Sequence, residues 1–405
     1  MPARPLHLLI PFALVPAADA QIALSKLDYP ALGALLSRAS LVERATGEDF
    51  QRTLPHERWL ATRFGALASP AGASASASAS AGAGAGAGAK AATANDDAPL
   101  APYMLLADGG DPGTARWAVV EPAHVQIAHD HLVLIEPDAL GLSDDECTAL
   151  LDAARPSFDA IGVRIEAPRK RRWYVSGDAL GELVAAPPLR AAGRSIEIWL
   201  PHDARTGDRS RAWMKLQNEI QMSWFEHPLN RTRESQGHLA VNGLWLYAQG
   251  TRAAGLSRPF ETVLSPALAT RGLGIASGAR TGAAPERFAD LARSIDDAKT
   301  GAAANSRDGA AGAQATPQAT SHATLVELDA LSSPFVQQDW YTWHETLARF
   351  EREWFAPALA ALKDGTLPSL SLTLTGDTGA ATFALTRHTL RLFWRRRPLA
   401  GAITE

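Results

Sequence analysis

The side chains best suited to chemistry are concentrated in one segment of the chain, Gln217–Gly250. Within it, polar and charged residues alternate with apolar ones: Asn218, Glu219, His227, Asn230, Arg231, Arg233, Glu234 and Asn242. Guanidinium and amide groups are the usual means by which proteins bind phosphate or carboxylate oxygens. The segment therefore predicts a site for a small anionic metabolite, with Asn230, Arg233, Asn242 and Trp245 as the binding residues.

The same four residues have a second interpretation, in which they stabilise the fold. Buried amide and guanidinium groups need hydrogen-bond partners and often pin one element to another. Here they would pin a long helix, predicted over Arg211–Glu226, to the aromatic strand Leu244–Tyr247. Glu219 and His227 could form an acid–base pair only if that helix continues to His227, and a structural role is favoured for both. The sequence leaves the two interpretations of the binding residues open.

The composition is that of a globular chain. It has 405 residues, 46% of them hydrophobic, and a formal net charge of −4. Such a chain can bury a substantial core and is long enough for two domains. The small negative charge predicts neither nucleic acid nor a membrane as a partner, and it does not determine the oligomeric state. The single cysteine, Cys147, excludes an internal disulfide and a thiolate metal cluster.

Two low-complexity stretches divide the chain. One is an Ala/Gly/Ser-rich linker over residues 68–98, and the other is a loop near residues 301–320. Both are predicted to be flexible, because such sequences cannot bury enough apolar surface to become ordered. They suggest an α/β core in two parts, residues 1–67 and 251–405, with an inserted α+β domain over residues 99–250.

The predicted order of elements in the inserted domain, βαββαβ, is typical of a ferredoxin-like sandwich. Its strands are predicted at His131–Ile135, Ile161–Ala167, Arg172–Val175 and Ser195–Leu200, with helices at Ser143–Ala154 and Asp178–Ala186. The helix Arg211–Glu226 follows, with an apolar stripe at Trp213, Leu216, Ile220 and Trp224. In the C-terminal part, we predict a helix at Trp340–Leu362 and strands at Leu370–Gly376 and Ala381–Thr386.

The stretch His227–Gly250 resembles a known family. It contains His-Pro-Leu-Asn at its start, Arg233 and Gly237 further on, and Asn242-Gly-Leu-Trp245 five residues before Gly250. This pattern is similar to the signature of a proteobacterial family of Rpf-type regulatory proteins, also labelled cofactor-independent phosphoglycerate mutase. More distantly, it resembles the archaeal-type cofactor-independent phosphoglycerate mutases of the alkaline phosphatase superfamily. The resemblance is specific from roughly Arg211 to Gly250.

The resemblance implies an alkaline-phosphatase-like layered core and chemistry with two divalent cations, Mn²⁺ or Mg²⁺. The first strand of those enzymes ends in Asp-Gly-x-Gly-Asp, where this chain has Pro11 and Phe12. A later strand of theirs ends in Asp-His, where this chain has Asp377 followed by Thr378. A third motif is represented by Asp339, with a histidine five residues later. We therefore expect no metal site and no cofactor, and Asp377 and Asp339 are weak candidates for catalysis.

The N-terminal apolar run, Leu6–Val15, has two interpretations. With Ala18-Asp19-Ala20 it imitates a signal peptide and its cleavage site, yet it also suits a buried strand of a parallel sheet. The resemblance places a core strand here, which favours a cytoplasmic protein. No later stretch approaches the ~18 apolar residues of a membrane span.

These observations favour a non-catalytic regulatory or ligand-sensing protein, a pseudoenzyme that binds a small phosphorylated or carboxylated metabolite. The alternative is an active, metal-dependent phosphotransferase of the phosphoglycerate mutase type, an isomerase that would use Mn²⁺ or Mg²⁺. The missing ligands favour the first hypothesis, because phosphoryl transfer through two metals requires them.

Overall fold

The structure is a computed structural model that describes residues 4–24, 28–48, 50–68, 97–128, 130–305, 322–392, 394 and 398–405. The predicted linker 68–98 and the predicted loop near 301–320 lie largely outside the described residues. The chain divides into two compact units, one formed by Met1–Trp59 with Ser257–Glu405 and the other by Leu60–Leu256. Residues 99–250, predicted as an inserted domain, belong to the second unit. Among the described helices, none is both long and apolar enough to cross a membrane.

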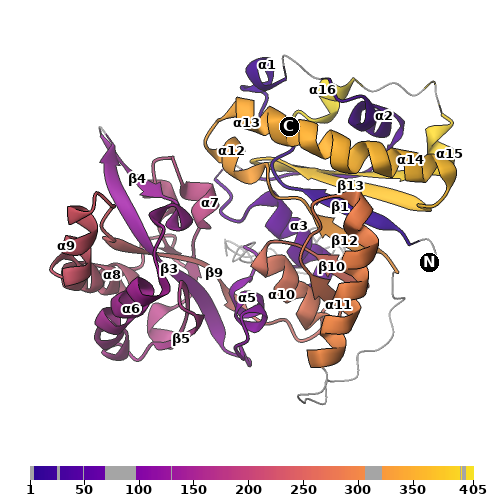
Figure 1. Ribbon diagram of the computed structural model, residues 1–405. Helices are drawn as coiled ribbons and strands as arrows, with labels where there is room; N and C mark the ends of the chain where they lie inside the picture. Colours follow the sequence, from indigo (N-terminus) through magenta and orange to yellow (C-terminus); the bar gives the residue numbers. More distant parts are fainter. Residues whose placement is uncertain are drawn as a thin grey trace, which may run out of the picture. The chain divides into compact units, whose positions relative to one another are not determined.

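The first unit is a mixed α/β structure built on a seven-stranded sheet (Figure 1). From edge to edge, its strands are β11 (Arg280–Gly282), β10 (Thr262–Leu264), β12 (Thr324–Glu327), β1 (Leu6–Ile10), β13 (Ser369–Thr375), β14 (Gly379–Thr386) and β2 (Ser40–Thr46). The strands from β11 to β13 are parallel, whereas β14 is antiparallel to both of its neighbours. The predicted α/β class is thus observed.

The apolar run at the N-terminus forms the central strand β1. Leu6, Leu8, Leu9 and Ile10 are all buried, as expected for a strand that lies between two parallel neighbours and is covered on both faces. The strand ends at Ile10, well before the predicted Val15. Pro11 follows, which cannot donate a hydrogen bond to a sheet, and Phe12 then turns the chain with a positive φ of 56°.

Helices make up the rest of the regular structure described in the first unit. They are α1 (Ala20–Ala23), α2 (Pro30–Arg38), α10 (Leu268–Ala276), α11 (Leu291–Asn305), α12 (Ser332–Val336), α13 (Trp340–Phe350), α14 (Ala356–Asp364), α15 (Arg387–Leu390) and α16 (Leu399–Ala402). A further helix, α3 (Pro55–Phe64), contains the division between the units. In Figure 1, α13 and α14 run end to end, joined by a π-helical turn at Glu351–Phe355. This continuous helix confirms the prediction for Trp340–Leu362.

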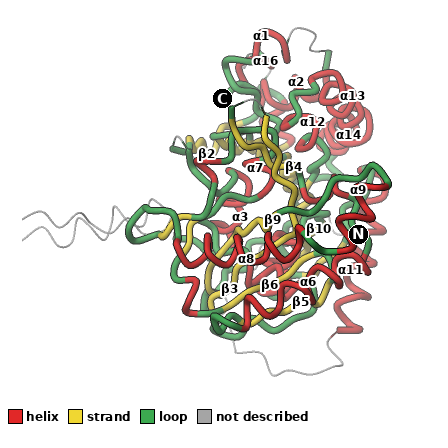
Figure 2. Tube along the Cα trace, turned by 90° about the vertical axis from the view of Figure 1, so that its left-hand side faces the viewer, coloured by secondary structure: helices red, strands yellow, loops and turns green. Residues whose placement is uncertain are grey.

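The second unit contains a five-stranded sheet with two helices packed beside it (Figure 2). In order, β5 (Arg164–Arg169), β6 (Arg172–Ser176), β3 (Arg116–Ala128) and β4 (His131–Ile135) pair with one another, and β9 (Gly243–Thr251) also pairs with β3. All these pairings are antiparallel. Helices α6 (Asp144–Asp159) and α8 (Arg211–Phe225) contact each other, and Trp173 and Trp224 meet edge to face with their ring centroids 6.1 Å apart.

Short elements connect the larger ones in the second unit. They are α5 (Ala101–Ala107), α7 (Pro188–Ala191), α9 (Pro228–Ser235), β7 (Leu183–Val184), β8 (His202–Asp203), and 3₁₀ helices at Pro137–Leu140, Asp178–Leu180 and Glu197–Trp199. A βαββαβ order is present, but it consists of β3, α6, β5, β6, α8 and β9. Its four strands lie in the spatial order β5-β6-β3-β9.

Two predicted elements of the second unit are wrong. The helix predicted over Asp178–Ala186 ends after one 3₁₀ turn, because Gly181 adopts a φ of 66° and a ψ of −161° that only glycine tolerates. The strand predicted over Ser195–Leu200 is a 3₁₀ turn as well. Its buried residues, Ile196 and Trp199, are three apart, which matches the period of a 3₁₀ helix and not the alternation of a strand.

The sequence did not predict β3, although it is the sheet's longest strand. Pro122 lies in its middle, and a proline argues against a central strand because it cannot donate to the ladder. In the structure, Pro122 falls between the residues that pair with β6, Ala118–Val120, and those that pair with β4, His124–Ala128. The proline therefore occupies a gap in the pairing on the side of β6 and β4, while on the other side it stays in register with Leu244 of β9.

Glu327 is a buried carboxyl group at the carboxyl end of β12. The adjacent strand β10 is followed by Ser265, whose hydroxyl donates to Glu327 Oε2 at 2.6 Å. Burial raises the pKa of Glu327 from its ordinary 4.5 to about 7, against the opposing effect of hydrogen bonds from Ser265 and Thr270. Because the folded state favours the protonated form, this group's contribution to stability is complete below pH ~4.5 and is lost as the pH rises through ~7.

Replacing Glu327 by Gln should therefore change the pH dependence of unfolding. Relative to Glu327→Gln, the free energy of unfolding of the natural chain should fall by on the order of 3 kcal/mol as the pH rises over that window. Urea denaturation at several pH values measures this difference, with the exposed Glu286→Gln as the matched control. A difference that stays constant with pH would contradict a raised pKa at Glu327.

Candidate functional site

Helix α8 presents two different faces side by side. Its buried stripe consists of Trp213, Leu216, Ile220 and Trp224, as predicted. The hydroxyl of Ser210 caps the helix by accepting from Trp213 N at 3.3 Å, which fixes where the helix begins. The neighbouring face, at i, i+3, i+4 and i+7, carries Met214, Gln217, Asn218 and Gln221.

That neighbouring face lines a cavity of about 400 Å³, which we name the amide pocket. Its polar lining consists of Arg209, Gln217, Asn218, Gln221 and Asn242, and its apolar lining includes Val125, Leu132, Ile196, Leu200, Trp213, Met214 and Trp245. Volume and lining are typical of small-molecule sites, which are mainly apolar with a few polar groups that orient the ligand.

Four polar side chains of the amide pocket are available to a ligand. Within the described part of the chain, Arg209, Gln217, Asn218 and Gln221 have no side-chain hydrogen bond or ion pair. Arg209 is held in place by its backbone, since it immediately precedes the Ser210 cap and forms a β-bridge with His202. The pocket thus offers one cation and three amides over an apolar wall.

Asn242 and Trp245 line the amide pocket, but their polar atoms are already used by the protein. The Asn242 side chain accepts from Val125 N and donates to Val125 O, both at 2.8 Å, and so extends the pairing of β9 with β3. Trp245 Nε1 donates to Ala186 O at 2.8 Å. These two residues can contact a ligand mainly through their apolar surface.

Asn230 and Arg233 do not line the amide pocket. The buried amide of Asn230 donates to Trp224 O at 2.9 Å and Val241 O at 2.8 Å, and its oxygen accepts from Val241 N at 2.8 Å. Asn230 therefore joins the end of α8 to the residue that leads into β9, which is the pinning role in the second interpretation of the sequence.

Arg233 is 4% exposed, and each nitrogen of its guanidinium group has a partner. Nε donates to Leu239 O at 2.8 Å, Nη2 to Leu140 O at 2.7 Å, and Nη1 to Glu146 Oε1 at 2.7 Å. Although burial alone would raise it, the hydrogen bonds from Ser143 and Arg233 hold the pKa of Glu146 below its ordinary value. Arg233 thus links α9 to the first turn of α6.

Glu219 and His227 are not brought together as an acid–base pair. Helix α8 ends at Phe225, and His227 caps α9 by accepting from Leu229 N at 3.2 Å. Glu219 is exposed and lies 3.9 Å from the ammonium group of Lys215. Both residues have local structural roles.

The two weak candidates for catalysis lie in the first unit. Asp339 caps α13: its carboxylate accepts from Thr342 Oγ1 at 2.7 Å and Thr342 N at 3.0 Å, and these bonds lower its pKa. Asp377 lies in the turn between β13 and β14. Among the described residues, no three His, Cys, Asp or Glu side chains lie together in a way that could hold a metal ion.

The chain was compared with known proteins and solved structures. No family model and no curated protein matches the chain. The chain is similar to a cofactor-independent phosphoglycerate mutase. That solved structure, from Thermoplasma acidophilum DSM 1728, has 14% sequence identity over 99% of this chain and 94% of its own, with a TM-score of 0.42. A protein from Pyrococcus horikoshii has 10% identity over 95% and 87%, with a TM-score of 0.47.

Membership of the Rpf-type family stays a prediction, and the function proposed below rests on residues of this chain. Sequence reasoning did not single out Arg209, Gln217 and Gln221 as site residues. The helical spacing of Gln217 and Gln221, one turn apart beside the apolar stripe, was the available signal. Arg209 carried no signal, because only the folded chain brings it to the same cavity.

Replacing Arg233 by Ala should destabilise the second unit by about 3 kcal/mol, because it leaves Glu146 and two carbonyl groups without their partner. Urea denaturation followed by tryptophan fluorescence measures this loss. The adjacent, exposed Arg231→Ala is the matched control and should change stability by no more than about 0.5 kcal/mol. Equal stability of the two variants would exclude the pinning role of Arg233.

Proposed function

We propose that the chain is a non-catalytic, regulatory ligand-binding protein. Its ligand is a small phosphorylated or carboxylated metabolite with an apolar part, bound in the amide pocket. The observation that carries this proposal is the set of four unengaged polar side chains, Arg209, Gln217, Asn218 and Gln221, in one largely apolar cavity. Gln217 is half-buried and the other three side chains are exposed, so all four are accessible to a polar ligand that enters this cavity.

The chemistry of the amide pocket defines the ligand class. Arg209 supplies the only formal charge of the lining, and a guanidinium group binds phosphate or carboxylate oxygens through two parallel hydrogen bonds. The amides of α8 add neutral donors and acceptors beside it. The pocket also has an apolar surface, formed by Trp213, Trp245 and Ile196, which favours the binding of a ligand with an aliphatic or aromatic portion.

The non-catalytic, regulatory part of the proposal is supported by the surroundings of the side chains that could otherwise take part in catalysis. Asp339 is engaged as a helix cap, and Pro11 and Phe12 occupy the end of β1, where the resembled enzymes have metal-binding aspartates. Cys147 is buried, which raises the pKa of its thiol to about 11 and keeps it protonated at neutral pH. We accordingly propose a metal-site-degenerate relative of the cofactor-independent phosphoglycerate mutases.

The fold proposed for this relative is an alkaline-phosphatase-like core with a ferredoxin-like insert. Support for the core comes from the parallel strands β11 to β13, with β1 at their centre. Support for the insert comes from the βαββαβ order of the second unit and its antiparallel strand order β5-β6-β3-β9. A cytoplasmic location remains part of the proposal, supported by the central position of the N-terminal strand in the sheet.

Titration calorimetry with phenyl phosphate, 3-phosphoglycerate and phenol tests the binding site. Phenyl phosphate should bind most tightly, because it satisfies both Arg209 and the apolar wall. Arg209→Gln should weaken its binding at least about tenfold, which corresponds to ~1.4 kcal/mol. Gln217→Met, which keeps the side-chain volume and removes the amide, should weaken binding less.

The matched control is Lys215→Gln, an exposed cation on the same helix that does not line the pocket. Equal binding of phenol and phenyl phosphate, or full affinity in Arg209→Gln, would contradict an anion site in the amide pocket. Turnover of 3-phosphoglycerate with added Mn²⁺ that is lost in Asp377→Ala would contradict the non-catalytic part and support the enzymatic alternative.

A further inference from the structure

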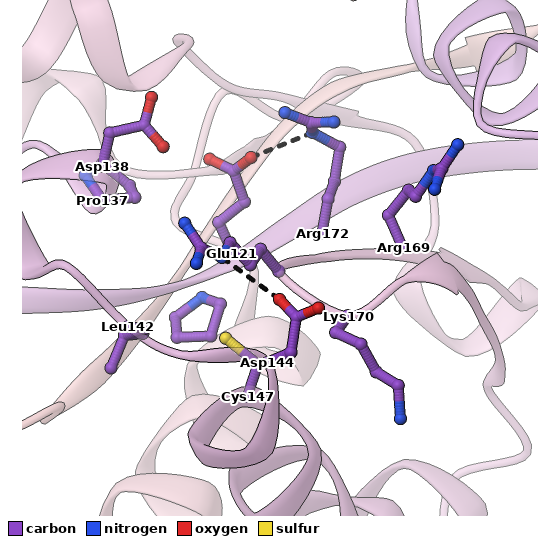
Figure 3. A pocket seen from close by; sticks show the side chains of 11 residues that line it. Glu121, Pro137, Asp138, Leu142, Asp144, Cys147, Arg169, Lys170 and Arg172 are labelled. Carbon is purple, nitrogen blue, oxygen red and sulfur yellow. Dashed lines mark hydrogen bonds and ion pairs between the residues drawn. The ribbon is translucent and has the colours of Figure 1, made fainter.

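A second cavity of the second unit shares no lining residue with the amide pocket. It has a volume of about 290 Å³ and lies between the β5–β6 turn, the start of α6 and the 3₁₀ helix Pro137–Leu140 (Figure 3). We name it the hairpin pocket. Its charged lining consists of the four consecutive cations Arg169 to Arg172 and the carboxylates Glu121, Asp138 and Asp144.

Two of the four cations are neutralised by the protein itself. Arg172 Nε lies 3.0 Å from Glu121 Oε1, and its Nη1 lies 3.3 Å from Asp108 Oδ2. Arg171 Nε lies 3.3 Å from Asp144 Oδ1 at the start of α6. Glu121 and Asp144 are thus engaged in ion pairs within the protein, and the single charge of Arg172 is shared between Glu121 and Asp108.

The other two cations keep an uncompensated positive charge on one side of the hairpin pocket. Arg169 is exposed and has no side-chain hydrogen bond or ion pair within the described ranges. Lys170 Nζ donates to Thr148 Oγ1 at 3.0 Å, but a hydroxyl does not neutralise the ammonium group. In Figure 3, both side chains extend on the same side of the cavity.

An uncompensated carboxylate lies on the opposite side. Asp138 is exposed, and its carboxylate too has no hydrogen bond or ion pair to any described residue. Its charge acts on its surroundings: after burial, it is the next cause of the raised pKa of Glu136. Figure 3 shows Asp138 across the cavity from Arg169 and Lys170, with the ion pair of Glu121 and Arg172 between Asp138 and Arg169.

One part of the hairpin pocket is apolar and unreactive. Pro137, Leu142 and Cys147 line it, and burial keeps Cys147 in its thiol form. A ligand therefore meets free positive charge on one side of the pocket and free negative charge on the other. A simple anion would leave Asp138 unpaired and would lie in its field, and a simple amine would do the same with Arg169 and Lys170.

We propose that the hairpin pocket binds a small zwitterion, whose phosphate or carboxylate contacts Arg169 and Lys170 and whose ammonium group contacts Asp138. Such a ligand satisfies both free charges at once, and electrostatic complementarity of this kind provides specificity against molecules that carry only one of the charges. This site is independent of the anion proposed for the amide pocket.

Titration calorimetry of the full chain with three matched probes tests the proposal. The probes are phosphoethanolamine, which carries both charges, ethyl phosphate, which lacks the amine, and ethylamine, which lacks the phosphate. Phosphoethanolamine should bind at least about tenfold more tightly than either of the others. Equal binding of ethyl phosphate and phosphoethanolamine would overturn the proposal, as would the absence of binding at millimolar concentrations.

Variants locate the site. Asp138→Asn should remove the preference for phosphoethanolamine over ethyl phosphate, and Arg169→Gln combined with Lys170→Gln should remove the preference over ethylamine. Because these side chains are exposed, the melting temperature should stay unchanged and shows that the variants fold. The exposed Asp159→Asn and Arg205→Gln are charge-matched controls outside the pocket and should preserve both preferences.

The affinity for phosphoethanolamine should also be unchanged in Arg209→Gln, because this substitution affects the amide pocket alone. If Arg209→Gln abolishes it while the variants of Asp138, Arg169 and Lys170 do not, the probe binds in the amide pocket and the proposal is wrong. If it survives Arg209→Gln and responds to Asp138→Asn, the hairpin pocket is the zwitterion site, whatever the outcome for the amide pocket.

Discussion

The second unit depends on the buried guanidinium group of Arg233. A buried charge is costly unless it is paired and all its donors are satisfied. Arg233 meets this requirement with three elements at once, through Leu239 O, Leu140 O and the carboxylate of Glu146. The same Glu146 side chain accepts from Ser143 N at 2.7 Å and closes the capping box of α6. One cation therefore fixes the position of α9, the start of α6 and the chain that leads into β9.

This constraint explains why some polar residues of the segment Gln217–Gly250 bind the protein backbone and others remain available to a ligand. Asn230 binds the backbone of Val241, just before β9, and Asn242 binds the backbone of Val125 in β3; together they position the start of β9. The apolar stripe of α8 packs into the core, and Trp224 Nε1 donates to Leu150 O of α6 at 3.0 Å. Because the packing of the apolar stripe fixes the orientation of α8, the neighbouring face with its amide side chains lines the amide pocket. Among the residues that carry the family resemblance, Asn242 and Trp245 line the pocket, whereas Asn230 and Arg233 stabilise the fold; Gln217, Asn218 and Gln221 remain available.

In the first unit, carboxylates are used to close the ends of elements. Glu351 accepts from the first free backbone N–H groups of α2, Ala31 N at 2.5 Å and Leu32 N at 3.0 Å. Glu405 holds the β13–β14 turn by accepting from Thr378 N and Gly379 N at 2.9 and 2.8 Å. Glu327 binds Ser265 across the ends of adjacent parallel strands. These contacts join residues that are far apart in sequence, and they commit the carboxylates to the fold.

The sequence by itself determined the α/β class, the C-terminal strands β13 and β14, and helix α8 with its stripe, and it gave a buried strand as one of two interpretations of the N-terminal run. These features depend on the local period of apolar residues, which the sequence displays directly. Strand β3 was concealed by Pro122, and Gly181 ended a predicted helix, because their effects depend on the pairing and backbone conformation of the folded chain. Only the tertiary structure decided that Asn230 and Arg233 face inward and that Arg209 joins the amides of α8. The physical reason is that the sequence does not show whether the partner of a polar side chain is a backbone carbonyl or a ligand. Only the folded chain determines which backbone groups lie within hydrogen-bonding distance of that side chain.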